Sequence, residues 1–142
     1  MANEANILTL YGQPKGEPIN FTIADGEAVE KGQIMKMSGA YTVAPAEGDN
    51  DIIAGIASSE KVASDGSTTI GVWTRGIFDV LVQGAVAIGD DITLSGTAAA
   101  GTAANILKKY TTVDNEKGYV LGKALEVVSA TNEDTIAVKL TL

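Results

Sequence analysis

The stretch TIGVWTRGIFDVLV, residues 69–82, contains two runs in which apolar residues recur at every second position. The alternating apolar residues are Ile70 and Val72 in the first run, and Phe78, Val80 and Val82 in the second. Side chains two residues apart lie on the same face of a β-strand, whereas a helix needs spacings of three and four. Gly76 separates the two runs, as glycine often does between strands. The stretch therefore predicts two consecutive strands, each with one face turned toward a core.

The same pattern and the composition extend this prediction to the whole chain of 142 residues. Residues two apart are again apolar at Ile136, Val138, Leu140 and Leu142. The chain contains 12 Val, 13 Ile and 14 Thr, whose β-branched side chains favour strands, and 16 glycines that punctuate the short runs. Turn-forming clusters lie at 64–67, 89–91 and 114–118. We predict one all-β domain, a small β-barrel or β-sandwich with at most one short helix.

The only candidate for that helix is an alanine-rich segment at residues 97–109. Gly101 interrupts this segment, and its apolar residues do not recur at helical spacing. We expect a loop or a short helical turn here, leading into a strand near residues 106–112.

The chain also resembles itself when it is shifted by 57 positions. The matched pairs include Phe21 with Phe78, Ile23 with Val80, Val29 with Val86 and Gly32 with Gly89; after a longer loop in the second copy, Gly55 matches Gly122 and Ile70 matches Ile136. Coincidence among common small residues is the alternative explanation. The repeat predicts a single β domain at 19–142, built from pseudo-repeated units of about 19–75 and 76–142.

Residues 1–18 lie outside this repeat and predict a flexible N-terminal arm. A short β-prone run is followed by Gly12, Pro14, Gly16 and Pro18, which disrupt regular structure. The run consists of Asn6, Ile7, Leu8, Thr9, Leu10 and Tyr11. Because the nearby prolines and glycines make pairing within the domain difficult, we expect this arm either to fray or to add to an outside sheet edge.

Charge and composition exclude several classes of function. Eighteen acidic and ten basic residues give a formal net charge of −8, which disfavours nucleic acid and anionic membranes as partners. The chain has neither histidine nor cysteine, so it lacks the commonest general base, the commonest metal ligands and any disulfide. The first ten residues also lack the basic and apolar regions of a secretory signal. No combination of residues predicts a catalytic, cofactor or metal site.

Two motifs nevertheless suggest chemistry. Residues 26–37, GEAVEKGQIMKM, are similar to the hairpin of biotinyl and lipoyl carrier domains, with Lys36 as the modifiable lysine. However, the alternation of Met35 and Met37 places Lys36 within a strand instead of at a turn tip, so we favour an ordinary surface lysine. The acidic run at 47–51, EGDND, could bind calcium, but it lacks the EF-hand spacing and is better explained as a solvated turn.

The tryptophan of the chain, Trp73, and the nearby Arg75 are candidate interface anchors. Trp73 lies in the outward phase of the strand at 70–74 and Arg75 follows it in the same phase, and these residue types are enriched at binding hot spots. The alternative is that both faces of the sheet are covered and that Trp73 is a core residue.

The order of motifs resembles that of the head decoration (capsid cement) proteins of tailed bacteriophages. These motifs are IAGIA at 53–57, a polar turn at 65–66, STTIGV at 67–72, RGIFDV at 75–80 and GDDI at 89–92. They are similar to the G-I-A strand, the loop, the T-T-β strand and the G-x-F strand of that family, and the likeness extends in pattern over residues 18–142.

The resemblance implies a β-tulip-like domain that is a structural virion protein and not an enzyme. It implies binding to the major capsid protein across subunit seams on the outer surface of the capsid, as a homotrimer at three-fold or quasi-three-fold sites, after synthesis in the host cytoplasm. The N-terminal run from Asn6 to Tyr11 would be the capsid-binding arm. The alternatives are a β-rich module of a phage tail or fibre and, less favoured, the carrier domain.

Overall fold

A computed structural model describes residues 5–9, 18–47, 51–95, 106–110, 120–129 and 133–142 of the chain. These residues form strands and contain no helix, which confirms the all-β prediction. The strands are β1 (Asn6–Thr9), β2 (Ile19–Ile23), β3 (Ile34–Gly39), β4 (Thr42–Pro45), β5 (Ile53–Ala57), β6 (Thr69–Trp73), β7 (Ile77–Gln83), β8 (Asp91–Leu94), β9 (Ile106–Lys109), β10 (Val120–Ala124) and β11 (Glu133–Leu140). The strand expected near residues 106–112 is therefore β9, whereas most of the alanine-rich segment lies outside the described residues.

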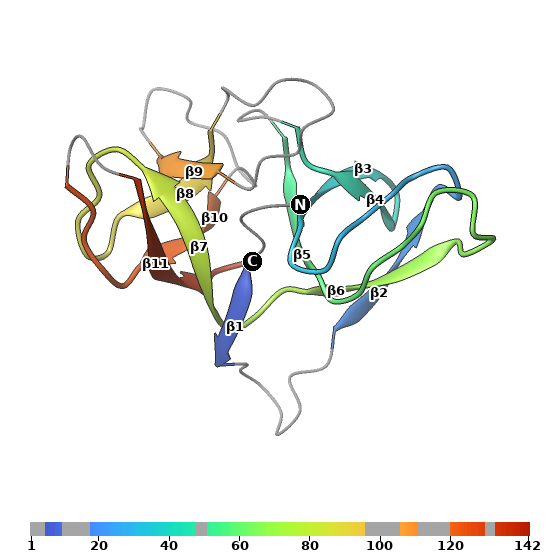
Figure 1. Cartoon of the computed structure of the whole chain (residues 1–142), viewed down its shortest axis with the longest axis horizontal. Helices are drawn as coiled ribbons and strands as arrows, with labels where there is room; N and C mark the ends of the chain where they lie inside the picture. The colour runs from blue at the N-terminus through green and yellow to red at the C-terminus, as the bar shows by residue number, and fades with distance from the viewer. Residues whose placement is uncertain (1–4, 10–17, 48–50, 96–105, 111–119, 130–132) are drawn as a thin grey trace.

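The strands form two sets that lie side by side along the long axis of the molecule (Figure 1). Strands β2, β4, β3, β5 and β6 form a closed barrel, which we call the N-terminal barrel. Strands β7, β11, β10, β8 and β9, with β1 added beside β7, form the C-terminal sheet. Because β9 also pairs with β7, the five strands of this sheet other than β1 form a closed cycle of pairings.

The two sets use the same pairing scheme. In both, the first and third strands of the set are parallel and all other neighbours are antiparallel. On β3 and β5 the opposed residues are Ile34–Ile56, Met35–Gly55 and Lys36–Ile53, and on β8 and β10 they are Asp91–Lys123, Ile92–Gly122 and Thr93–Val120. The register slips at the same step in both sets. The isolated bridges Val29–Lys61 and Val86–Val128 also occupy corresponding places.

At β2 and β7, however, the structural correspondence differs from the 57-residue shift. The parallel pairings are Ile23 with Val43 and Val82 with Leu107. Ile23 therefore corresponds to Val82, and Phe21 corresponds to Val80, so the predicted matches Phe21–Phe78 and Ile23–Val80 are wrong by two residues. Val29 follows Ile23 by six residues, whereas Val86 follows Val82 by only four, so the C-terminal sheet has two residues fewer at this point. A slip of two leaves every side chain on its original face, so an alternating pattern cannot detect it.

Two clusters of buried residues form the core. The larger one includes residues of both sets, among them Ile56 and Trp73 of the N-terminal barrel and Phe78 of the C-terminal sheet. The rings of Trp73 and Phe78 are 5.6 Å apart, at the junction of the two sets. The smaller cluster fills the N-terminal barrel alone. The two sets therefore share apolar packing at their junction.

Gly55 and Gly122 occupy corresponding positions, and both are needed for close backbone approach. A Cβ atom on Gly55 would clash with the carbonyl oxygen of Trp73, and one on Gly122 would clash with the carbonyl oxygen of Lys139. Backbone atoms cannot move aside as a flexible side chain can. This requirement explains why the repeat keeps glycine at both places.

Candidate functional site

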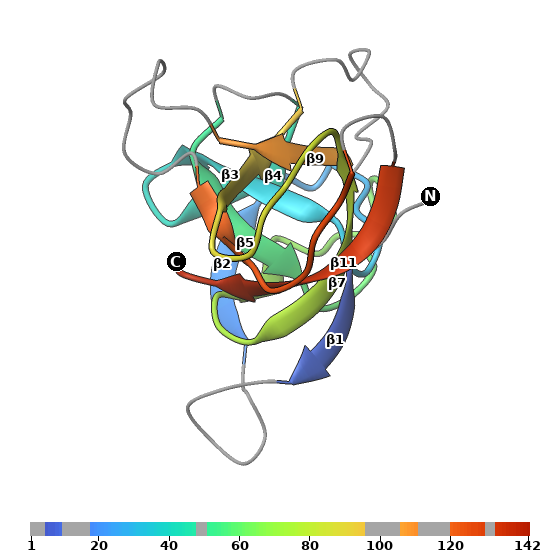
Figure 2. The ribbon, with the colours of Figure 1, turned by 90° about the vertical axis from the view of Figure 1, so that its left-hand side faces the viewer.

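The N-terminal segment lies across both halves of the molecule. Strand β1 pairs antiparallel with the start of β7, with Asn6 opposite Asp79 and Ile7 opposite Phe78 (Figure 2). Just before it, Ala5 is buried, and its N–H donates a hydrogen bond of 2.9 Å to the carbonyl oxygen of Gly32, in the N-terminal barrel. The expectation that this run cannot pair within the domain is therefore wrong for Asn6–Thr9, because the disrupting prolines and glycines all follow it. Leu10 and Tyr11 lie outside the described residues.

Strand β1 is an edge strand of the C-terminal sheet. Leu140 N–H donates a hydrogen bond to the carbonyl oxygen of Gly76, so the backbone groups of Gly76 point toward β11. Because backbone groups alternate in direction along a strand, those of Phe78 also point toward β11, and those of Asp79 point toward β1. The backbone groups of Ile7, opposite Phe78, consequently point away from β7. Among the described strands, none pairs with β1 on that outer side. The role of this run in binding a capsid stays a prediction, but its edge is suited to receive another strand.

The two candidate interface anchors lie in different environments. Trp73 is only 9% exposed and belongs to the core shared by the two halves, which favours the core alternative. Arg75, two residues further along, is exposed. Alternation alone could not decide between the two interpretations, because it does not show whether the second face of β6 is covered.

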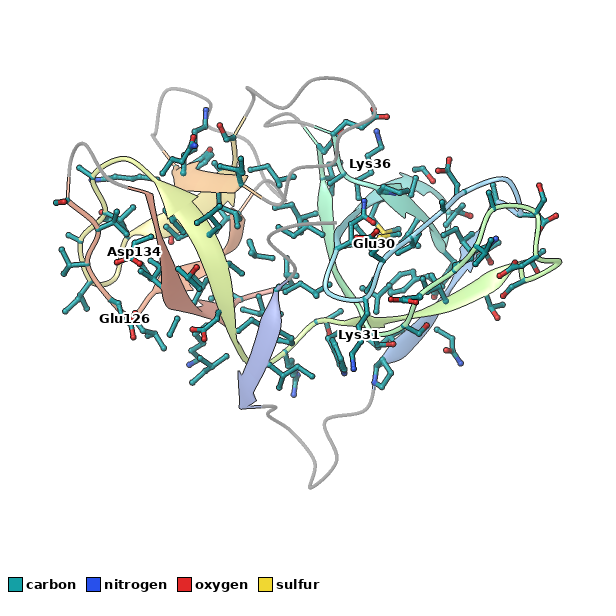
Figure 3. All side chains as sticks on the ribbon, viewed as in Figure 1. Glu30, Lys31, Lys36, Glu126 and Asp134 are labelled. Carbon is teal, nitrogen blue, oxygen red and sulfur yellow. The ribbon has the colours of Figure 1, made fainter. Side chains whose placement is uncertain are left out.

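Lys36 and the acidic run at 47–51 contact one another. Lys36 lies within β3, as its alternation predicts (Figure 3). Its Nζ is 3.0 Å from Glu47 Oε2 and 3.6 Å from Asp51 Oδ1. The hydrogen bond to Glu47 raises the pKa of Lys36 above 10.5. A strand lysine held by two carboxylates does not resemble the exposed turn lysine that a carrier domain presents. The same pairing gives the carboxylates a cation of their own, which supports the solvated-turn explanation over a calcium loop.

A buried lysine, Lys61, was not singled out from the sequence. The side chain of Lys61 is 2% exposed, and its Nζ donates hydrogen bonds to the carbonyl oxygens of Asp25 at 2.8 Å and Val62 at 3.2 Å and to Asp65 Oδ1 at 3.0 Å. The pKa of Asp65 is lowered, first by the hydrogen bond from Ser67 N–H and then by Lys61. The cluster fixes the turn at 62–67 to the turn after β2. In the sequence, the only sign of this lysine cluster is that acidic and glycine-rich turns lie near Lys61.

A second acidic turn, at residues 87–90 of the C-terminal sheet, is held by Asp90. Its Oδ2 accepts a hydrogen bond from Ala87 N–H at 2.8 Å and lies 3.3 Å from Lys109 Nζ. The bond from Ala87 is the main cause that lowers the pKa of Asp90, and Lys109 adds to it. In both acidic turns, therefore, an aspartate carboxylate stabilises the turn by accepting a hydrogen bond from a nearby backbone N–H.

Within the described residues, no three or more acidic side chains come together in a group that could hold a metal ion. Over the same part of the chain, no helix has the length and apolarity needed to cross a membrane.

Comparison with known proteins gives a family match and a match to a solved structure. The structure is titled as the "head fiber gp8.5 N base" of bacteriophage phi29; it is 12% identical, covers 87% of this chain and 92% of its own, and superposes with a TM-score of 0.49. Curated proteins give no match. The family match, described as phage cement protein, extends over residues 13–140. Since this match spans nearly the whole chain, the protein belongs to the phage cement protein family and is a structural, capsid-stabilising protein of the virion.

Proposed function

We propose that the protein binds the outer surface of the capsid across the seams between shell subunits, as a homotrimer at three-fold or quasi-three-fold sites, with β1 as its contact. A shell filled with packaged DNA is under outward load, and its seams are where it fails first. A protein that holds a seam needs a rigid body and many contacts, and no reacting groups. The shared core of the two halves supplies the rigid body.

The observation that carries this proposal is the edge position of β1. An exposed edge presents backbone N–H and C=O groups in a row, and an extended segment of a partner can pair with them whatever its side chains. Because β1 is already ordered on β7, binding needs less loss of conformational freedom than the folding of a free arm would. We therefore infer that β1 accepts a strand of the major capsid protein while it stays docked on β7.

Charge and valency support the same function. With a net charge of −8 the protein is repelled by packaged DNA and attracted by basic patches of the shell. Three copies in one assembly would bind three edges at once, so that weak individual contacts give a high overall affinity. Light scattering of the purified protein should give three times 14.6 kDa, and a stable dimer would contradict the trimer.

The test of the β1 contact replaces Ile7, whose backbone groups point to the outer side. Ile7→Pro removes one outward N–H without removing a bond to β7, and edge strands tolerate proline at such positions. We expect its affinity for capsids that lack the protein to fall about tenfold, the equivalent of one good hydrogen bond.

The matched control is Ile7→Val, which keeps the N–H and a β-branched side chain and should bind as the wild type does. Circular dichroism checks that both variants keep the wild-type melting profile. Binding of Ile7→Pro with unchanged affinity would show that β1 is not the contact.

A further inference from the structure

The N-terminal barrel has an open edge at the place where the C-terminal sheet carries β1. On one side of β7, β9 pairs with Leu81–Gln83 and β1 pairs with Ile77–Asp79. On the same side of β2, β4 pairs with Thr22 and Ile23, and no described strand pairs with residues 19–21. The barrel thus repeats the β7–β9 pairing but leaves the counterpart of the β1 position uncovered by any strand that the structure describes.

The register identifies which backbone groups this edge presents. Ile23 N–H donates to Thr68 oxygen at 3.0 Å, toward β6, and Thr22 N–H donates to Tyr41 oxygen at 2.7 Å, on the opposite side. Because backbone groups alternate in direction along a strand, the N–H and C=O of Asn20 point to the same side as those of Thr22. Asn20 corresponds to Asp79, the residue that lies opposite Asn6 of β1.

The side chains next to this edge are apolar and exposed. Ile19 corresponds to Phe78, which faces Ile7 of β1, yet Ile19 is 50% exposed whereas Phe78 is fully buried. Tyr41, whose carbonyl oxygen marks the end of the β4 pairing, is 77% exposed. An added strand with an apolar residue opposite Ile19 would cover part of this surface, as β1 does on β7.

We infer that residues 19–21 of β2 form a second strand-accepting site and that its occupant is an extended segment of the capsid's shell protein. The β1 of a second copy fits the site less well, because one of its edges is paired with its own β7 and the other is the edge that binds the shell in the proposed function. A shell segment that is not yet paired gains the new hydrogen bonds outright.

The inference rests on the proposed function and explains how one copy could hold a seam. The outer edge of β1 belongs to the C-terminal sheet, whereas the edge of β2 belongs to the N-terminal barrel. Two acceptor edges on two halves of one rigid body can each hold a segment from a different shell subunit. Binding at both would be cooperative, since the second contact forms at a high effective concentration.

The test uses Asn20→Pro in the full chain. Asn20 N–H points away from β6, so proline removes an outward donor and leaves the β2–β6 pairing in place. We expect affinity for capsids that lack the protein to fall about tenfold, and hydrogen exchange at residues 19–21 to slow on capsid binding in the wild type only.

Asn20→Ala keeps the N–H and is the control that should retain wild-type affinity. If Asn20→Pro lowers the melting temperature, Ile19→Lys serves as a second variant, because a charged side chain on an edge opposes strand addition.

Four outcomes separate the explanations. Loss of affinity in Asn20→Pro and Ile19→Lys, but not in Asn20→Ala, supports the second site. Unchanged affinity and exchange in Asn20→Pro, while Ile7→Pro is weakened, would overturn it and leave the proposed function intact. Failure of the wild type to bind capsids would overturn the proposed function, and this inference with it. Concentration-dependent self-association that Asn20→Pro abolishes would assign the edge to a second copy instead of the shell.

Discussion

The N-terminal barrel and the C-terminal sheet share a pairing scheme but differ in the side chains at the turns and bridges that join their strands. Lys61 and Val128 occupy corresponding bridge positions, yet one is a buried lysine with three oxygen partners and the other an apolar side chain. The same architecture is thus compatible with an ionic or an apolar residue at one place. Backbone pairing defines the fold, and the side chains at the corresponding turns and bridges can differ between the two sets.

Corresponding turns of the two sets also differ in the polarity of their side chains. Ile88, Leu125 and Val127 are exposed in the C-terminal sheet, and the corresponding residues of the N-terminal barrel are Lys31, Ser58 and Glu60. The polar set shows that the fold does not require apolar residues at these positions. The exposed apolar set is therefore a feature of the C-terminal half alone.

The largest expected effect comes from breaking the contact between the two halves at Trp73. Trp73→Ala removes a buried ring that packs on Phe78, and we expect the free energy of unfolding to fall by about 4 kcal/mol. Trp73→Phe keeps an aromatic contact and should lose roughly 1–2 kcal/mol. Because the chain has a single tryptophan, unfolding should be followed by calorimetry or circular dichroism.

The shape of the transition tests the coupling. If the shared core joins the halves, the wild type unfolds in one transition, and Trp73→Ala separates it into two or lowers it as a whole. A loss below about 1 kcal/mol with an unchanged transition would show that the two halves do not depend on this contact.

A slightly smaller effect tests whether the two halves are equivalent. Gly55→Ala and Gly122→Ala each place a Cβ against a backbone carbonyl of the neighbouring strand, and each should destabilise the protein by about 3 kcal/mol, measured by chemical denaturation. Gly26→Ala is the control, because no atom lies within 4 Å of its Cβ position. If one glycine of the pair tolerates alanine and the other does not, the equivalence of β5 with β10 is lost.

These features differ in how far the sequence could predict them. Alternation predicted β7 well, because Phe78, Val80 and Val82 are all buried in a strand with one covered face. The matched glycines predicted a true correspondence, because close backbone approach permits no other residue. The two-residue slip at β2 could not be detected from the sequence, since a shift by an even number of residues leaves the alternating pattern unchanged.

The N-terminal site was predictable only in part. The β-prone run at residues 6–11 was visible, but its docking partner was not, because strand pairing depends on which distant edge is open. The burial of Trp73 depended likewise on a contact with the next strand and not on the local pattern. The end of β11 shows the same limit: Leu142 continues the apolar alternation but lies beyond the strand and is exposed.

The smallest expected effect sharpens the contrast between Lys61 and Val128. Lys61→Met keeps the length of the side chain but removes the ammonium group from its three oxygen partners, and we expect a loss of about 2 kcal/mol at pH 7. The value lies below that of a fully buried ion pair because Asp25 and Asp65 remain accessible to water. Lys31→Met removes the same charge from an exposed position (Figure 3) and should change stability by less than about 0.5 kcal/mol.

The pH dependence identifies the ionic contribution in this pair of variants. The pKa of Asp65 is lowered in the folded protein, so its stabilisation is complete above the unfolded value, near 3.8, and is lost as the pH falls through the folded value. In Lys61→Met the hydrogen bond from Ser67 N–H still lowers this pKa, but less, so the difference in stability between the wild type and Lys61→Met should shrink as the pH is lowered below 4. Urea denaturation between pH 7 and pH 3 measures this difference. A difference that stays constant over that range would mean that Lys61 stabilises the turn through its carbonyl contacts alone, and that its ion pair with Asp65, which has no counterpart at Val128, contributes nothing measurable.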